Sequence, residues 1–316
     1  MILIGSILHL IATGGFWQNA LADSVLFLLP ALGGVLSERS GVVNIAMEGM
    51  MLTGAFAAVV ADLAWGNPWL AALVAIIAGG IMALIHAVVS IQFRADQIIS
   101  GIAINIFAAG VTTFLLNKIY GQQGISHITD QQALPVVNIP LLDRLPFVGQ
   151  VLFQQNVVVY AALILLVVIN IFLFRTRLGL RLRAVGEHPH AADTAGINVF
   201  QIRYSAVIAS GLLSGLAGAF LSIGIANTFN PNMTEGRGYI ALAAMIFGKW
   251  TPIGAFISCL IFGVGQVIFD NNSTLPASPY FLQMVPYVLT LIVLAGFVGK
   301  SLPPAADGIP YEPEGE

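Results

Sequence analysis

The stretch GGVLSERSGVVNIAMEGMMLTGAF, from Gly33 to Phe56, decides the fold class because it joins two apolar runs through a short charged connection. An apolar run of about 17–25 residues is long enough to cross a bilayer as a helix. The runs on either side cover 19–36 and 43–64, and the basic Arg39 lies between them. The stretch therefore predicts two membrane-spanning helices that are joined by a tight turn.

The composition extends this prediction to the whole chain of 316 residues. Apolar residues make up 58% and charged residues 9%, whereas soluble domains have roughly 45–50% and about 25%. With 12 Lys+Arg and 15 Asp+Glu, a soluble fold of this length lacks the charges to cover so much apolar surface. We expect an all-α polytopic membrane protein, and the same numbers exclude disordered chains, disulfide scaffolds and nucleic-acid-binding proteins.

Further apolar runs predict about 9–10 transmembrane helices in a single transmembrane domain that covers 1–316. Beyond the first two, the expected spans are 68–92, 98–116, 156–174, 204–225, 252–269 and 280–299. The shorter run 237–250 is a candidate half-helix. The segment 2–17 is either a further span or an interfacial helix.

The basic residues predict the orientation, because Lys and Arg are enriched in cytoplasmic loops. The connection 175–203 contains five arginines, so we place it in the cytoplasm. Alternating the spans from there puts nine of the 12 basic residues inside. The long connection 117–155 is then external, and the short tail 300–316 is cytoplasmic.

Two short segments resemble each other within the chain. IAMEGM at 45–50 is similar to IALAAM at 240–245, and the predicted topology runs the two copies in opposite directions. Opposed copies are typical of an inverted-topology repeat, which is common in transport proteins.

Small residues recur at helical spacing in the run 204–225. Gly211, Ser214, Gly215 and Gly218 form overlapping small-xxx-small steps. Such steps allow helices to approach closely, so we predict that this span packs tightly against a neighbour.

Glu48 is the clearest intramembrane acid of the chain, about six residues inside the run 43–64. Asn44 lies four residues earlier and would share its helix face, and Asn105 is a further intramembrane polar residue. Such side chains either line a translocation route or form hydrogen bonds between helices. Both interpretations stay open, and Asn44, Glu48 and Asn105 are the candidate pathway residues.

The segment EHPHAADTAG, 187–196, predicts a short helix within the cytoplasmic connection. Pro189 suits the first helical position, the alanines favour a helix, and Gly196 suits its end. A short helix framed by arginines is the expected structure.

Enzymatic signatures are missing from the sequence. Gly299-Lys300-Ser301 resembles the end of a phosphate-binding loop, but Leu294 stands where the first glycine is required. The spacing of Glu187, His188 and His190 fits no ordinary zinc site. We therefore expect no catalytic residue, no metal and no cofactor on this chain.

Two stretches together resemble a known family: the one from Gly33 to Phe56, and GLRLRAVGEHPHAADTAGINV from Gly179 to Val199. They are similar to the permease subunits of bacterial ABC importers of the branched-chain amino acid/simple-sugar permease family, in its nucleoside/simple-sugar branch. The tail from Pro303 to Tyr311 fits the same branch, and the resemblance covers nearly the whole chain. It implies a multi-pass permease of the bacterial inner membrane.

The resemblance also implies partners that the chain itself lacks. They are a second permease subunit, homologous or identical, a separate ABC ATPase that holds ATP and Mg²⁺, an extracytoplasmic substrate-binding protein, and the lipid bilayer. The short helix of 187–196 would be the coupling helix that contacts the ATPase. The implied contact residues are Glu187, Pro189, Ala191, Ala192, Asp193, Ala195 and Gly196.

Nucleosides are the substrate that the resemblance favours, with riboflavin and simple sugars as alternatives in the same importer class. An alternative of a different class is a secondary transporter or channel that works alone. Such a protein would be expected to carry ion-coupling acids within its spans, and it would not need a helical docking loop.

Overall fold

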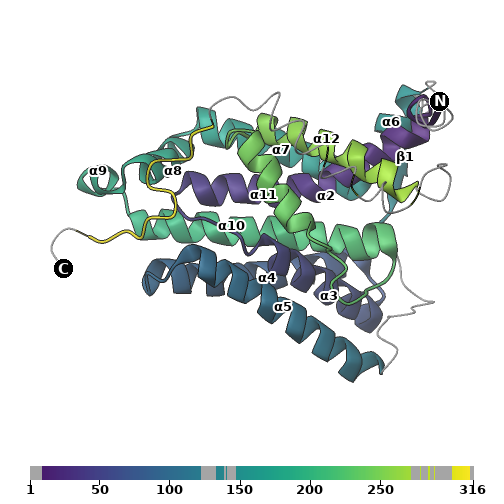
Figure 1. The fold of residues 1–316 in the computed structure, drawn as a ribbon, viewed down its shortest axis with the longest axis horizontal. Coiled ribbons are helices and arrows are strands. Elements are labelled where there is room, and N and C mark those ends of the chain that lie inside the picture. Colours follow the sequence, from purple (N-terminus) through teal and green to yellow (C-terminus); the bar gives the residue numbers. More distant parts are fainter. Residues whose placement is uncertain are drawn as a thin grey trace.

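The computed structural model describes residues 9–121, 133–138, 140, 147–271, 278, 284, 288 and 301–313, which form an elongated helical bundle (Figure 1). In the first half of the chain the elements are α2 (Gly14–Arg39), α3 (Met47–Trp65), α4 (Pro68–Ala87) with its π-helical continuation η1 (Val88–Gln92), α5 (Gln97–Tyr120), β1 (Val136–Asn138), α6 (Val148–Phe153) and β2 (Gln154–Asn156). They are followed by α7 (Val157–Arg175), α8 (Arg177–Glu187), α9 (Pro189–Thr194), α10 (Val199–Ala219) with its π-helical continuation η2 (Phe220–Ala226), α11 (Arg237–Phe247) and α12 (Pro252–Asp270). The strands β1 and β2 form one antiparallel ribbon in which Val137 pairs with Gln155.

Seven helices of the described residues are long and apolar enough to cross a membrane. They are α2, α3, α4 with η1, α5, α7, α10 with η2, and α12. The all-α polytopic class is therefore confirmed, and each of these helices overlaps a span predicted from the sequence. The predicted span 280–299 lies outside the described residues except for 284 and 288.

Two segments were not assigned as full spans from the sequence, 237–250 and 2–17. The run 237–250 contains α11, which has 11 residues and is about 16 Å long at 1.5 Å per residue, so it is a half-helix as predicted. Of the segment 2–17, residues 1–8 lie outside the described part of the chain. Its last four residues belong to α2, which begins at Gly14 after Thr13 as N-cap.

A polar cap followed by proline starts two of the long helices. The side chain of Asn67 accepts hydrogen bonds from two backbone N–H groups at the start of α4, and Thr251 accepts one at the start of α12. Pro68 and Pro252 occupy the first turn, where a proline costs no helical hydrogen bond. The same local signal therefore begins both helices.

The helix α10 lies at the centre and packs against α4, α3 and α2 (Figure 1). A Cβ atom added at Gly215 would overlap the backbone of α4 at Ala75, and one at Gly218 would overlap the backbone of α3 at Met51. These contacts confirm the close packing predicted from the small-residue steps.

The helices α2 and α10 run antiparallel, since Gly33 of α2 lies against Ser210 while Gly41, just beyond α2, lies against Arg203. Each helix is followed by a break, a shorter helix (α3 or α11) and then a capped helix (α4 or α12). Two units of the same order in opposite directions agree with the inverted repeat expected from the sequence.

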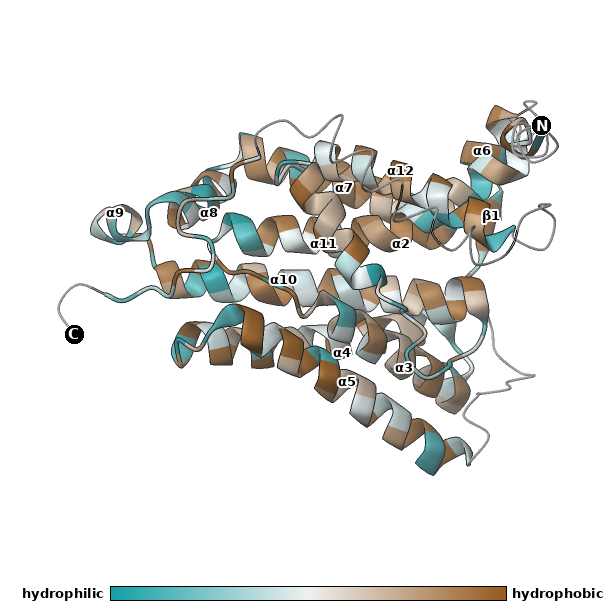
Figure 2. Ribbon diagram, in the orientation of Figure 1, coloured by the Kyte–Doolittle hydropathy of each residue, from teal (hydrophilic) through white to brown (hydrophobic). Residues whose placement is uncertain are grey.

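Apolar residues predominate along α4, α5 and α7 (Figure 2), and many of their large side chains are exposed. On α5 the exposed ones include Ile98, Ile102, Ile106 and Phe114. An unpartnered apolar surface of this extent suits lipid or another membrane subunit.

Candidate functional site

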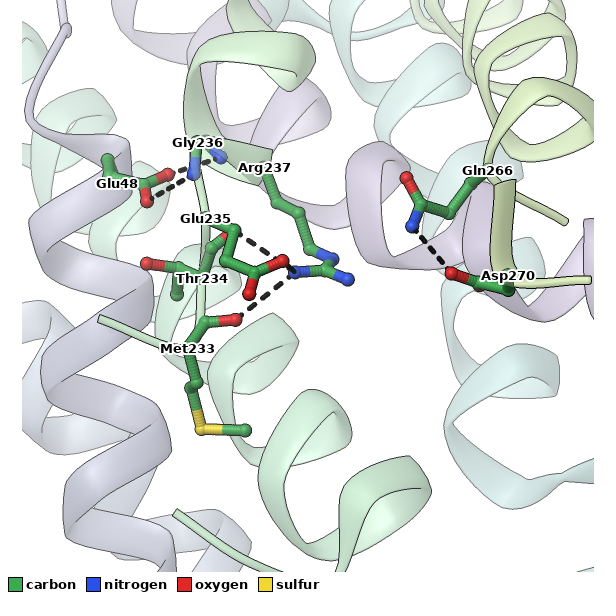
Figure 3. Close-up of polar contacts among 9 residues, drawn as sticks. Glu48, Met233, Thr234, Glu235, Gly236, Arg237, Gln266 and Asp270 are labelled. Carbon is green, nitrogen blue, oxygen red and sulfur yellow. Dashed lines mark hydrogen bonds and ion pairs between the residues drawn. The ribbon is translucent and has the colours of Figure 1, made fainter. Parts of the chain in front are cut away.

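The carboxylate of Glu48 binds the backbone at the start of α11 (Figure 3). Its Oε1 accepts a hydrogen bond from the N–H of Gly236 at 2.8 Å, and its Oε2 accepts one from the N–H of Gly238 at 2.7 Å. The residue is only 6% exposed, so both bonds lie inside the bundle.

This carboxylate lies at the N-termini of two helices at once. Glu48 is in the first turn of α3, and Gly236 is the N-cap of α11. The first N–H groups of a helix have no partner within it, and the N-terminus carries a partial positive charge. Inside a bilayer, each unsatisfied backbone group costs several kcal/mol. Glu48 therefore satisfies donors at the start of α11 and balances the charge where the N-termini of α3 and α11 meet.

Asn105, on α5, completes the same junction. Its Oδ1 accepts a hydrogen bond from the N–H of Gly49 at 2.7 Å, and its Nδ2 donates to the carbonyl of Ile45 and to the hydroxyl of Tyr239, both at 2.9 Å. Asn105 thus bonds to both sides of the break before α3 and to the first turn of α11. We call this group the junction: Asn44, Glu48 and Asn105 with the starts of α3 and α11.

Asn44 faces α10 rather than sharing a helix face with Glu48. Its Nδ2 donates to Ser210 Oγ at 2.8 Å, and its Oδ1 accepts from the N–H of Ala46 at 3.1 Å. This side-chain-to-backbone bond competes with helix formation, so α3 begins at Met47 and not at 43 as predicted. The expectation that Glu48 lies six residues inside a helix is therefore wrong.

The structure brings the three candidate pathway residues together, with their polar atoms bonded within the chain. These are the contacts of residues that hold helices together. A direct contact of Asn44, Glu48 or Asn105 with a solute stays a prediction.

The connection 175–203 is more helical than expected. The predicted short helix is present as α9, with Pro189 in its first turn and Gly196 just beyond it at φ +80°. Glu187, however, ends the preceding helix α8 and does not start α9. The sequence signal for α8 is its amphipathic pattern, in which Leu182 and Val185 are buried while Arg177 and Arg181 are exposed.

The residues expected to contact an ATPase differ in their exposure. Glu187, Ala191, Asp193, Ala195 and Gly196 are exposed, and Pro189 is partly buried. The helix α9 projects from one end of the molecule (Figure 1). Ala192 is buried against Val185, Val199 and Tyr311. The expectation that Ala192 lies on the exposed face is therefore wrong, since successive helical residues point about 100° apart.

The C-terminal tail 301–313 ties this end of the bundle together. The N–H of Ala306 donates to the carbonyl of Gly186 at 2.9 Å, and the N–H of Ala305 donates to Glu187 Oε2 at 3.2 Å. Arg203 donates from Nη1 to the carbonyl of Ile309 at 3.0 Å. The tail therefore connects α8 to α10 directly beside α9.

Burial dominates the electrostatics of this tail. It raises the pKa of Asp307 to about 7, although Glu38 and the Arg203 guanidinium act in the opposite direction. Arg203 is itself 1% exposed, so it is a structural residue of α10 and not part of the solvated, positively charged loop.

Sequence reasoning did not identify Gly236 and Gly238 as the partners of Glu48, nor Tyr311 as a packing residue of α9. The only sequence signal is that these residues are glycines: a Cβ atom at Gly238 would lie 2.5 Å from the backbone N of Glu48, so no larger residue fits there. That signal needs the fold, since the two residues are 190 positions apart.

Comparisons with known proteins show that the chain is similar to the permease subunits of transporters. Residues 17–294 match the family model described as branched-chain amino acid transport system / permease component. The chain is 45% identical over 295 residues to the guanosine ABC transporter permease protein NupQ of Bacillus subtilis, covering 90% of this chain and 92% of that one. It is 42% identical over 308 residues to the nucleoside ABC transporter permease protein NupC of Lactococcus lactis, with coverages of 93% and 95%.

More distant relatives show how the family varies. The putative glucose ABC transporter permease protein TsgC13 of Haloferax volcanii is 36% identical, with 89% of this chain and 91% of that one covered. Bacillus subtilis has a second relative, the guanosine ABC transporter permease protein NupP, at 27% identity and coverages of 87% and 80%. No solved structure matches the chain.

Proposed function

Because the chain belongs to the branched-chain amino acid transport system permease family, we propose that it is the membrane-spanning subunit of an ATP-driven importer of nucleosides. The observation that carries this proposal is the near full-length identity of 45% and 42% to permeases named for guanosine and for nucleosides. The chain is a multi-pass protein of the bacterial inner membrane, in agreement with its seven apolar helices.

Permeases of ABC transporters work with ATPase subunits and with a second permease. Two relatives from one bacterium, NupQ and NupP, differ strongly in their identity to this chain. This difference supports a pair of non-identical permeases in which this chain corresponds to NupQ and the second permease to NupP. An extracytoplasmic binding protein that delivers the solute, and ATP with Mg²⁺ on the ATPase, complete the proposed assembly. In it this chain has a transport role and no catalytic one.

The exposed part of α9 is the proposed contact with the ATPase. Two grooves of about 420 Å³ and 290 Å³ lie at the turn that follows α9, and Gly196, Ile197 and Asn198 line both of them. A projecting helix beside two grooves suits docking against a complementary surface. Ala191 and Ala195 are small, so the backbone of the partner can approach closely.

Uptake of tritiated guanosine tests the function. A strain from which this gene is deleted should lose saturable guanosine uptake and should regain it with the wild-type gene. Uptake should also vanish when the ATPase subunit is replaced by a catalytically inactive variant. Uptake that survives this replacement but collapses with a protonophore would instead indicate a secondary transporter.

The substrate class needs its own comparison. Guanosine, glucose and riboflavin are offered to the same pair of strains at equal concentrations. We expect the deletion to affect guanosine uptake most strongly. A loss confined to glucose would support a sugar importer, which the resemblance to TsgC13 makes the second candidate, and a loss confined to riboflavin would support the third.

A further inference from the structure

A polar cavity of about 370 Å³ lies between the ends of α2, η2 and α12 and the strand β2. These ends are at the opposite end of the bundle from α9 (Figure 1), on the side predicted to be extracytoplasmic. The volume falls in the range of small-ligand pockets, about 300–1,000 Å³. We call it the outer cavity. Its polar lining includes Gln18, Asn19, Asp23, Gln154, Asp270 and Asn271.

Several of these side chains have hydrogen-bonding capacity to spare. Among the described residues, Asn19, Asp23 and Gln154 have no side-chain hydrogen-bond partner within the chain. Asp270 accepts one bond, at 3.0 Å from Nε2 of Gln266 on the same helix. This contrasts with the junction, where the candidate residues bond within the protein. Polar groups without internal partners are available to a ligand or to water.

The rest of the wall is apolar. Val136, Phe220 and Val267 line the outer cavity beside the amides and carboxylates. An apolar wall with a few polar groups at its edge suits a flat heterocycle that carries hydrogen-bonding groups on its rim.

The acidic groups of the cavity suit hydroxyl donors. Two carboxyl groups, Asp23 and Asp270, line the cavity, and the guanidinium of Arg237 extends from the start of α11 toward α12 (Figure 3). Carboxyl oxygens are acceptors and can receive hydrogen bonds from two adjacent hydroxyl groups. A phosphate offers acceptor oxygens instead of donors, so it cannot replace these hydroxyl groups opposite the two carboxyl groups.

We propose that the outer cavity is the first solute-binding site of the permease, in which Asp23 and Asp270 accept hydrogen bonds from the ribose hydroxyls of a nucleoside. The amides of Asn19 and Gln154 bind the edge of the base, and the apolar wall contacts its face. The inference rests on the proposed function and adds the location, the contacts and the exclusion of nucleotides.

Direct binding tests this site separately from transport. The complete complex of permeases and ATPase is reconstituted in nanodiscs without the binding protein, and tritiated guanosine is bound at equilibrium. We expect Asp23→Asn and Asp270→Asn each to weaken guanosine binding about tenfold, since each removes a charged hydrogen-bond acceptor. Guanosine 5′-monophosphate should not compete in the wild type.

A ligand without ribose hydroxyls supplies the chemical control. 2′,3′-Dideoxyguanosine should bind the wild-type complex about tenfold more weakly than guanosine, and Asp23→Asn should not weaken it further. The matched protein control is Glu312→Gln, whose side chain is 71% exposed and lies in the C-terminal tail, away from the cavity, so it should bind guanosine as the wild type does.

Two results would overturn the inference: no saturable guanosine binding to the wild-type complex, or equal guanosine affinity in the wild type and in both aspartate variants. Either result is distinguishable from a failure of the proposed function, because uptake by the deletion strain is measured independently. Loss of affinity in Glu312→Gln to the same degree would indicate a general effect of negative charge and would also reject the site.

Discussion

The carboxylate of Glu48 and the backbone N–H of Gly238 are 2.7 Å apart, although 190 residues separate them in the chain. The bond joins the two oppositely directed units of the fold at the point where each is interrupted. An acid in this place stabilises the helix N-termini that a membrane would otherwise leave unsatisfied. The junction therefore explains why a charged residue is kept inside a span.

Replacing Glu48 by Gln should lower the free energy of unfolding by about 1–3 kcal/mol, because the new amide NH₂ faces a backbone N–H that needs an acceptor. The measurement is the Tm of the purified complex in detergent, with Glu312→Gln as the control for loss of an exposed charge. A variant with wild-type Tm and strongly reduced uptake would show that Glu48 acts on the solute instead.

The neighbouring alanines of α9 should respond differently to arginine. Ala191 is exposed, so Ala191→Arg should leave the permease folded but reduce recovery of the ATPase in a pull-down. Ala192 is buried against Val185 and Tyr311, so Ala192→Arg should lower the amount of folded permease itself, since it inserts a charge into a packed cluster. Full ATPase recovery and full uptake with Ala191→Arg would reject α9 as the coupling helix.

Close packing at α10 predicts that Gly215→Ala is strongly destabilising. The added methyl group overlaps the backbone of α4 at Ala75, and overpacking of this kind costs about 1–3 kcal/mol or more. Gly110→Ala is the matched control, because nothing lies within 4 Å of its Cβ position. The Tm of the two variants should differ by several degrees. Equal values would contradict the packing described here.

Asp307 should make the tail sensitive to pH. Burial raises its pKa to about 7, above the value of about 3.9 in an unfolded chain, so the folded protein binds the proton more tightly. The folded state is therefore destabilised progressively as the pH rises from about 4 to about 7, and the loss is complete above that.

The variant Asp307→Asn removes Asp307 from the hydrogen-bonded pair that it forms with Glu38. The Tm of the variant relative to wild type should rise between pH 5 and pH 8, because the asparagine has no proton to lose. Limited proteolysis of the tail at both pH values provides a second measurement. A constant difference in Tm between the variant and the wild type over this range would show that the pKa of Asp307 does not change on folding.

The sequence predicted the seven described spans because membrane insertion depends on local quantities. Length, apolar composition and the sparse distribution of charge are properties of each segment, and the bilayer demands that every span satisfies its own backbone. Pro189 and Gly196 likewise marked α9 through backbone preferences that neighbouring residues do not override.

The starts and faces of the elements were decided by the tertiary structure. The helix α3 begins only at Met47, because the side chain of Asn44 forms hydrogen bonds with Ser210 and with the N–H of Ala46. Ala192 is buried because Tyr311 of the tail packs against it. The sequence by itself determined that an acid lies within the membrane, through the residue at position 48. Only the tertiary structure decided what that acid does, because its partners on α11 are brought within hydrogen-bonding distance by the packing of α11 against α3, and no local pattern records such a contact.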